Sequence, residues 1–250
     1  MPYNQHANRA EFLLRKAVLI AKIEEKIDYL LPLTNHTLSE GIHFHHWPST
    51  NSRRQSNADH SLIIYEAVKS WVAEHYNLDS ASIEIIKTDN GKPEVYVSEH
   101  GTITRLGNCY ISISHCPRLS VWTVQDRPCA IDIECLRPRR YLDRLVQRLI
   151  HAIDWKDPLS IPLSDTELYD AWLQLDADEQ LTGFYALWTF AEAWCKWHGQ
   201  TLWHTFDNGI PFPWPSWQAL IHRPSVHLGS QRRVSFYHAN QHLIASINPD

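Results

Sequence analysis

The alternation of apolar and polar positions predicts a chain of mixed helices and strands. Apolar residues recur at helical spacing from about residue 60 to 75, where Asn57 or Asp59 can cap the helix, and this stripe consists of Leu62, Ile63, Ala67, Trp71 and Val72. A second amphipathic helix is expected along the stripe Leu142, Leu145, Val146, Leu149, Ile150 and Ile153. An acidic helix is expected over residues 165–179. An aromatic helix is expected from Tyr185 to His198, ending at Gly199, because glycine favours the position after a last helical turn.

The strand predictions rest on short β-rich runs between turn signals. Residues 110–114, 121–124 and 130–134 are such runs, separated by Pro117 and by residues 126–128, and they predict an antiparallel sheet. Two more strands, at 233–238 and 242–247, are expected after a loop rich in Pro and Trp over residues 207–217. Residues 8–30 fit either a helix or a helix and a strand. With no repeat or long linker, we expect one compact unit.

Composition narrows the class of protein. The chain has 250 residues, 44% of them hydrophobic, and a formal net charge of -5, which argues against a general nucleic-acid binder because phosphate contacts require a basic surface. No apolar run approaches the ~18 residues of a membrane span, and the N-terminal segment lacks the apolar stretch of a signal peptide. The five cysteines form no C-x-x-C pair. We therefore expect a cytoplasmic protein without membrane contact, disulfide or structural zinc.

The aromatic helix carries an acid and a base inside a run of tryptophans. In "ALWTFAEAWCKWHGQTLW", residues 186–203, Glu192 and Lys196 are four residues apart and share a helical face with Trp188. A surface ion pair is the simpler interpretation, since such pairs are common and add only a few tenths of a kcal/mol.

A pair of carboxylates lies in the run "AIDIE", residues 130–134. In a strand Asp132 and Glu134 share one face, while Ile131 and Ile133 point to the core. Oxygen ligands of this kind suit Mg²⁺, with Glu192 as a candidate third carboxylate. The alternative is the solvated face of an edge strand.

Histidines occur in two further motifs. In "ISISHCP", residues 111–117, Ser114 and His115 could bind an anion, or His115 could bond a carbonyl. A hydrolase triad with Asp132 is disfavoured, because neighbouring strand residues point to opposite faces and no G-x-S-x-G motif exists. In "HFHH", His43 and His45 share a face and could bind a transition metal, although packing is the favoured interpretation.

Four of these motifs together resemble those of the surfactin-type (Sfp-like) 4′-phosphopantetheinyl transferases. They are "GKP" at 91–93, "ISISHC" at 111–116, "AIDIE" at 130–134 and "WTFAEAWCK" at 188–196, and they occur in the family's order and spacing. The resemblance implies transfer of phosphopantetheine from coenzyme A to a serine of an acyl or peptidyl carrier protein. It also implies an α+β fold of two pseudo-symmetric halves with coenzyme A and Mg²⁺ in the cleft between them. Residues 1–125 would hold the adenine and 3′-phosphate, and residues 126–250 the metal and the catalytic helix.

The resemblance also assigns roles to individual residues. Asp132, Glu134 and Glu192 would hold Mg²⁺, and Lys196 would reach a phosphate oxygen of coenzyme A. Lys92 and Pro93 would lie near the adenine, and Ser114 and His115 near the 3′-phosphate. The general base would be Glu192 or a water held by the metal, and the sequence leaves both open.

The chain departs from the family's pattern at three positions. Ala191 stands where the family usually has lysine, so one cationic contact to phosphate is expected to be missing, and Ala130 replaces a glycine. His60 stands where relatives commonly carry an arginine for the 3′-phosphate. Arg53 or Arg54 is the expected replacement, because a helix N-terminus favours anions.

The segment "RPRRYLDRLVQR", residues 137–148, has five arginines and one aspartate, a local charge of +4. It is either a solvated helix face or the docking surface for an acidic carrier protein near Arg137, Arg139 and Arg140. We expect a monomeric enzyme whose carrier and pathway (fatty acid, polyketide or nonribosomal peptide) the sequence leaves open. A noncatalytic coenzyme A-binding or regulatory relative is the main alternative, and a metal-dependent phosphohydrolase is a weaker one.

Overall fold

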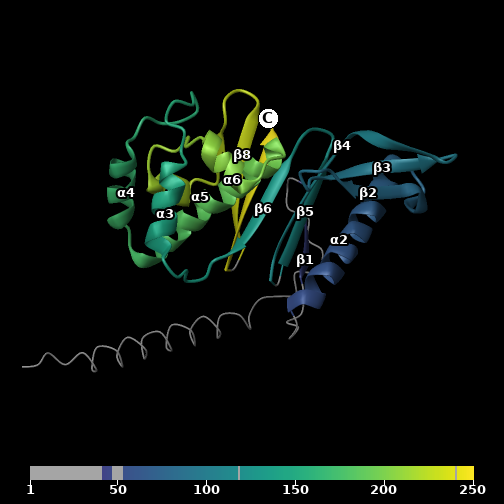
Figure 1. The fold of residues 1–250 in the computed structure, drawn as a ribbon, viewed down its shortest axis with the longest axis horizontal. Helices are drawn as coiled ribbons and strands as arrows, with labels where there is room; N and C mark the ends of the chain where they lie inside the picture. The colour runs from purple at the N-terminus through teal and green to yellow at the C-terminus, as the bar shows by residue number, and fades with distance from the viewer. Residues whose placement is uncertain (1–40, 47–52, 118, 240) are drawn as a thin grey trace, which may run out of the picture. The chain divides into compact units, whose positions relative to one another are not determined.

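The fold consists of two antiparallel sheets, each accompanied by helices (Figure 1). The computed structural model describes residues 41–46, 53–117, 119–239 and 241–250, and their side chains except those of 46, 53–60 and 239. An α+β class was expected, and these two sheets with their helices agree with it.

The first sheet has the strand order β1-β5-β4-β3-β2. Its strands are β1 (Ile42–His46), β2 (Ile83–Lys87), β3 (Pro93–Glu99), β4 (Thr102–Cys116) and β5 (Leu119–Gln125). The long helix α2 (Arg53–Tyr76) packs Ile64, Val68 and Val72 against this sheet, and the short 3₁₀ helix η1 (Ser80–Ser82) leads into β2. Apolar side chains spaced by three or four residues on α2 therefore form one side of this core.

The second sheet has the order β6-β9-β8-β7. Its strands are β6 (Ala130–Cys135), β7 (Ser225–His227), β8 (Arg232–Ala239) and β9 (His242–Pro249). Its helices are α3 (Leu142–His151), α4 (Asp165–Leu173), α5 (Ala177–His198), α6 (Leu202–Asn208) and α7 (Trp217–His222). Helix α5 lies on this sheet, and its Phe184, Leu187 and Phe190 are fully buried in an aromatic core with Trp214 and Trp217.

The helix predictions held in type and differed at several ends. Helix α2 already includes Asn57 and Asp59, so neither caps it. The predicted core stripe was wrong at Leu62 and Ile63, which are 61% and 45% exposed. The stretch 165–179 is two helices, because Asp176 accepts hydrogen bonds from the amides of Asp178 and Glu179 and starts α5 there. The predicted end of α5 is confirmed, with Gly199 in the left-handed conformation at φ 64°.

The strand predictions are confirmed at 110–114 and 121–124, which pair in β4 and β5, and at 233–238 and 242–247, which pair in β8 and β9. The run 130–134 forms β6, but β6 pairs with β9 in the second sheet and not with β5. Helices α6 and α7 and strands β2, β3 and β7 were not predicted. Residues 8–30 lie outside the described residues.

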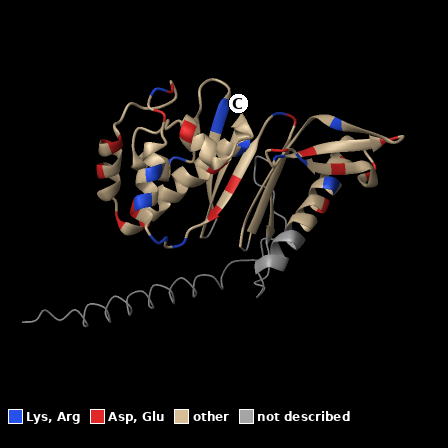
Figure 2. Cartoon of the chain, in the orientation of Figure 1, with Lys and Arg blue, Asp and Glu red and all other residues tan. Residues whose placement is uncertain are grey.

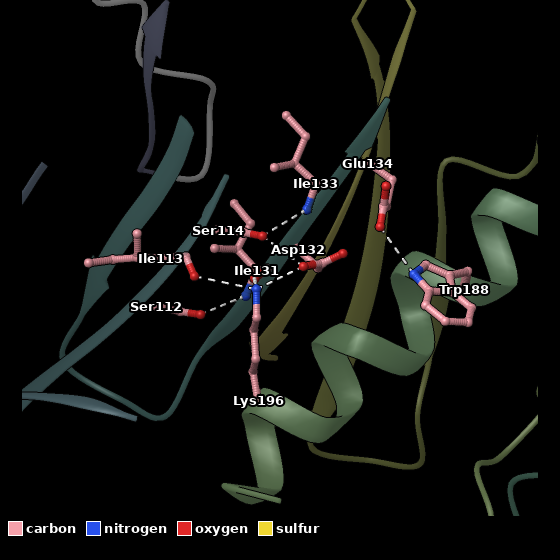
Figure 3. Close-up of polar contacts among 9 residues, drawn as sticks. All are labelled: Ser112, Ile113, Ser114, Ile131, Asp132, Ile133, Glu134, Trp188 and Lys196. Atoms are coloured by element: carbon pink, nitrogen blue, oxygen red, sulfur yellow. Dashed lines mark hydrogen bonds and ion pairs between the residues drawn. The ribbon is translucent and has the colours of Figure 1, made fainter. Parts of the chain in front are cut away.

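The two sheets meet where β6 lies beside β4. Ile131 and Ile133 of β6 pack into a shared core with Ile42, Phe44 and Val121 of the first sheet. The even-numbered residues of β6 point to the other face, toward α5 (Figure 3). The chain crosses from one sheet to the other between β5 and β6, over residues 126–129.

Candidate active site

The candidate site lies between β6 and α5. As expected, Asp132 and Glu134 share the strand face opposite Ile131 and Ile133. They meet side chains eight residues apart on α5: Trp188 contacts Glu134, and Lys196 contacts Asp132. Side chains on one face of the helix thus lie opposite alternate side chains on one face of the strand.

Glu134 is held by two donors. The indole Nε1 of Trp188 donates to its Oε1 at 3.1 Å, and Nη2 of Arg139 donates to its Oε2 at 3.4 Å. Arg139 is itself fixed, because its Nε donates to the Tyr185 hydroxyl at 2.7 Å. Burial and the negative charge of Asp132 raise the pKa of Glu134, against the opposing effects of Arg139 and Trp188.

Glu192 lies between these two contacts along α5 and is partly buried. Burial and the charge of Asp132 raise its pKa to about 7, with Lys196 opposing the rise and Glu134 adding to it. Near neutral pH about half of this carboxyl is therefore ionised. A pKa near neutrality, set by burial and by like charges, is typical of functional sites.

The ammonium of Lys196 makes three hydrogen bonds within the protein. Its Nζ donates to Oδ1 of Asp132 at 2.8 Å, to the carbonyl of Ile131 at 3.1 Å and to the carbonyl of Ile113 at 3.3 Å (Figure 3). An ammonium has three donors, and these three acceptors match them. Lys196 thus links β4, β6 and α5, in contrast to the surface pair with Glu192 that was the simpler expectation.

The three carboxylates are the candidate metal ligands. Among the described residues, no group of three His, Cys, Asp or Glu side chains is arranged to hold a metal ion. The physical reason is that Glu134 turns to Trp188 and Arg139, and Oδ1 of Asp132 turns to Lys196. Within the described part of the chain, however, the buried Oδ2 of Asp132 has no hydrogen-bond partner. An unpaired carboxylate oxygen beside two carboxyls of raised pKa fits a divalent cation, which together with the Lys196 ammonium would balance the charge of three carboxylates.

Two small hollows lie at the turn between β2 and β3, and the one that Lys196 lines adjoins this cluster. One, of about 110 Å³, is lined by Lys92, Pro93, Ser112 and Lys196 among others. The other, of about 120 Å³, is lined by Pro93, His115, Lys87 and Tyr65 among others. Lys92, Pro93 and His115 are therefore near one another, and Lys196 lies at the same surface.

Ser114 and His115 lie on opposite faces of β4. Ser114 is buried and donates from its hydroxyl to Oδ1 of Asp132 at 2.7 Å, whereas His115 is exposed and lines the second hollow. This follows from strand geometry, in which successive side chains alternate. The structure thus groups Ser114 with the carboxylates and does not place it beside His115.

Ala191 is fully buried in the core of the second sheet. Position 191 points about 100° away from Glu192 around the helix. That a lysine contact to phosphate is missing here stays a prediction. The side chains of Arg53, Arg54 and His60 lie outside the described ones. His43 stacks on Trp122 with ring centroids 3.9 Å apart, which agrees with a packing role.

Two residues near the site were not singled out from the sequence. Ser112 accepts a hydrogen bond from the Ile131 amide at 3.0 Å, and Lys87 lines a hollow. The alternation in "ISIS" already places Ser112 and Ser114 on one face, so the pair was detectable. Nothing comparable distinguishes Lys87.

Comparison with curated proteins finds two relatives of this chain, and both are 4′-phosphopantetheinyl transferases. One is 4′-phosphopantetheinyl transferase Sfp of Bacillus subtilis (strain 168), 24% identical over 169 residues, which are 68% of this chain and 61% of the relative. The other is 4′-phosphopantetheinyl transferase ffp of Bacillus subtilis, 25% identical over 185 residues, or 73% of this chain and 68% of the relative. No protein-family model matches the chain. The similarity to Sfp-like phosphopantetheinyl transferases that the motifs indicated is thus confirmed.

Proposed function

We propose that this protein transfers 4′-phosphopantetheine from coenzyme A to a serine of an acyl or peptidyl carrier protein, with Mg²⁺ as cofactor. The observation that carries the proposal is the convergence of Asp132, Glu134, Glu192 and Lys196 beside a hollow that Lys92 and Pro93 also line. Coenzyme A would lie across the junction of the two sheets, with its adenine near Lys92 and Pro93 and its pyrophosphate near the carboxylates.

The residues of the chain would bind the metal, hold its ligands in position and could accept the proton of the attacking serine. A bound Mg²⁺ would supply positive charge to the pyrophosphate, and Asp132, Glu134 and Glu192 would hold it. The proton of the attacking serine would go to Glu192 or to a water held by the metal. The pKa of about 7 belongs to Glu192 in the metal-free site, and a bound cation would lower it. Lys196 would act mainly by holding Asp132 and the two strands, since its donors are engaged there.

The carrier protein would dock on the basic surface of α3 and the segment before it. Figure 2 shows Lys and Arg colour along α3 and on the segment that leads into it. Arg137, Arg140 and Arg144 are exposed there, next to the 63% exposed Tyr141. Arg139 is less available, because Glu134 and Tyr185 already hold it. Exposed arginines beside an aromatic ring suit an acidic helix.

The direct test is transfer to apo carrier proteins. The protein is incubated with coenzyme A, Mg²⁺ and apo carriers of fatty-acid, polyketide and peptide synthesis, and intact masses are measured. We expect one phosphopantetheine on a carrier, release of adenosine 3′,5′-bisphosphate, and no gain on a carrier whose acceptor serine is replaced by alanine. Asp132→Asn, which keeps the shape of the side chain but removes its charge, serves as the matched inactive control.

A noncatalytic coenzyme A-binding relative is the second candidate. The engagement of all three Lys196 donors within the protein favours it, because the Lys196 ammonium is then not available to the phosphates. Coenzyme A binding by calorimetry without transfer to any carrier would support this candidate and contradict the enzyme. We place either function in the cytoplasm, in a monomer. Among the described helices, none is long and apolar enough to cross a membrane.

A further inference from the structure

Side chains join β4 to β6 where no backbone ladder does. The Ile131 amide donates to the hydroxyl of Ser112 at 3.0 Å, and the Ile133 amide donates to the hydroxyl of Ser114 at 3.4 Å (Figure 3). The Lys196 ammonium bonds the Ile113 and Ile131 carbonyls across the same line. We call this line of three side chains, Ser112, Ser114 and Lys196, the seam.

Ser114 makes one contact that Ser112 does not. Its hydroxyl proton goes to Oδ1 of Asp132 at 2.7 Å, and Lys196 donates to the same oxygen at 2.8 Å. The Asp132 side chain is 8% exposed, and its Oδ2 has no partner among the described residues. The terminal torsion of an aspartate is broad, so two donors on one oxygen restrict a rotation that packing alone leaves soft.

We propose that Ser114 is a positioning residue: with Lys196 it fixes the carboxylate of Asp132 through Oδ1 and so leaves Oδ2 to bind a divalent cation. This inference rests on the proposed function and gives Ser114 a different role from contact with the 3′-phosphate of coenzyme A. Hydrogen bonds to a ligating carboxylate commonly set its orientation and its affinity for the metal.

Ser112 provides the matched control for this role. It sits two residues away on the same face of β4, is equally buried, at 5% against 6% exposed, and accepts an amide of β6 in the same way. If Ser114 only joined the sheets, Ser112→Ala and Ser114→Ala should behave alike. If Ser114 positions Asp132, only Ser114→Ala should weaken cation binding.

The experiment titrates the full chain with Mn²⁺ and measures free Mn²⁺ by electron paramagnetic resonance, without coenzyme A or carrier. We expect Ser114→Ala to raise the Kd for Mn²⁺ by ~10-fold or more and Ser112→Ala by less than ~3-fold, the difference being that of a lost hydrogen bond to a ligand. Ser114→Thr, which keeps the hydroxyl, should return the Kd to within ~3-fold of wild type. Thermal unfolding of each variant shows that it is folded.

Equal Kd values for folded Ser112→Ala and Ser114→Ala would overturn the inference, as would absence of Mn²⁺ binding by the wild type. Should Ser114→Thr not fold, the comparison of the two alanine variants still decides. Transfer by the wild type is measured in parallel. Transfer with equal Kd values refutes the positioning role and leaves the proposed function intact, whereas no transfer refutes the proposed function itself.

Discussion

Replacing Glu192 by glutamine should stabilise the metal-free protein while abolishing transfer. Burial and the neighbouring carboxylates disfavour the charged form of Glu192, because they raise its pKa from the ordinary value of 4.5 to about 7. At 1.36 kcal/mol per pH unit this rise corresponds to about 3 kcal/mol against the ionised form. Partial exposure of the side chain and the cost of burying an amide reduce the net gain, so we expect about 1 to 3 kcal/mol.

The pH dependence follows from the direction of the pKa change. Below about pH 4.5 the carboxyl is neutral in both the folded and the unfolded chain, so wild type and Glu192→Gln should be equally stable. Between pH 4.5 and 7 the unfolded chain ionises first, and the wild type loses stability relative to the variant. Above pH 7 the difference is complete and constant.

The assay is thermal unfolding in EDTA from pH 4.5 to 8.5. For a domain of this size each kcal/mol corresponds to about 2 to 4 °C, so Tm at pH 8 should rise by roughly 2 to 12 °C. Glu74→Gln, an exposed carboxylate on α2, is the control and should show no pH-dependent difference. Added Mg²⁺ should reduce the advantage of Glu192→Gln, because a cation stabilises only the wild type. A variant no more stable than wild type at pH 8 would refute the claim that the cluster disfavours this charge.

Four other variants test neighbouring parts of the structure. Lys196→Met should lower stability by about 2 to 4 kcal/mol in urea unfolding, because it removes the cation beside the buried Asp132 and the donor to two carbonyls. Unchanged stability would contradict the structural role of Lys196 in the seam. Ala191→Lys should lower Tm and should not tighten coenzyme A binding measured by calorimetry, because position 191 is in the core. Tighter binding would show that a lysine side chain at this position reaches the phosphates. Arg140→Glu combined with Arg144→Glu should raise the KM for carrier protein several-fold in a salt-dependent way and leave the KM for coenzyme A unchanged. Arg139→Glu should instead lower kcat, because Arg139 holds Glu134. Equal effects of the double substitution on both KM values would contradict the proposed docking surface.

The sequence predicted the parts of the fold that depend on local pattern. Gly199 ends α5 and Asp132 shares a face with Glu134 because both follow from the geometry of one element. The partner of β6 could not be predicted, since its pairing with β9 joins residues more than 100 positions apart. The start of α2 was misplaced because Asn57 and Asp59 are residue types that favour a cap, whereas this long helix contains both of them.

At the site, residue types were easier to predict than their contacts. Spacing alone aligned Trp188, Glu192 and Lys196, but the Ile113 and Ile131 carbonyls that hold Lys196 are backbone groups with no sequence signal. The burial of Ala191 was not predicted, because a motif gives position along the chain and not direction around the helix. The placement of Ser114 away from His115 was available from strand alternation.

The seam also predicts where local unfolding between the two sheets should begin. The amides of Ile131 and Ile133 are protected by two serine hydroxyls and not by a neighbouring strand's carbonyls. In hydrogen–deuterium exchange, these two amides should report separation of β4 from β6 as an opening distinct from global unfolding, while the amides that bond to β9 exchange later. The junction that holds Asp132 would then be the first part of the second sheet to open, and cation binding there should slow its exchange.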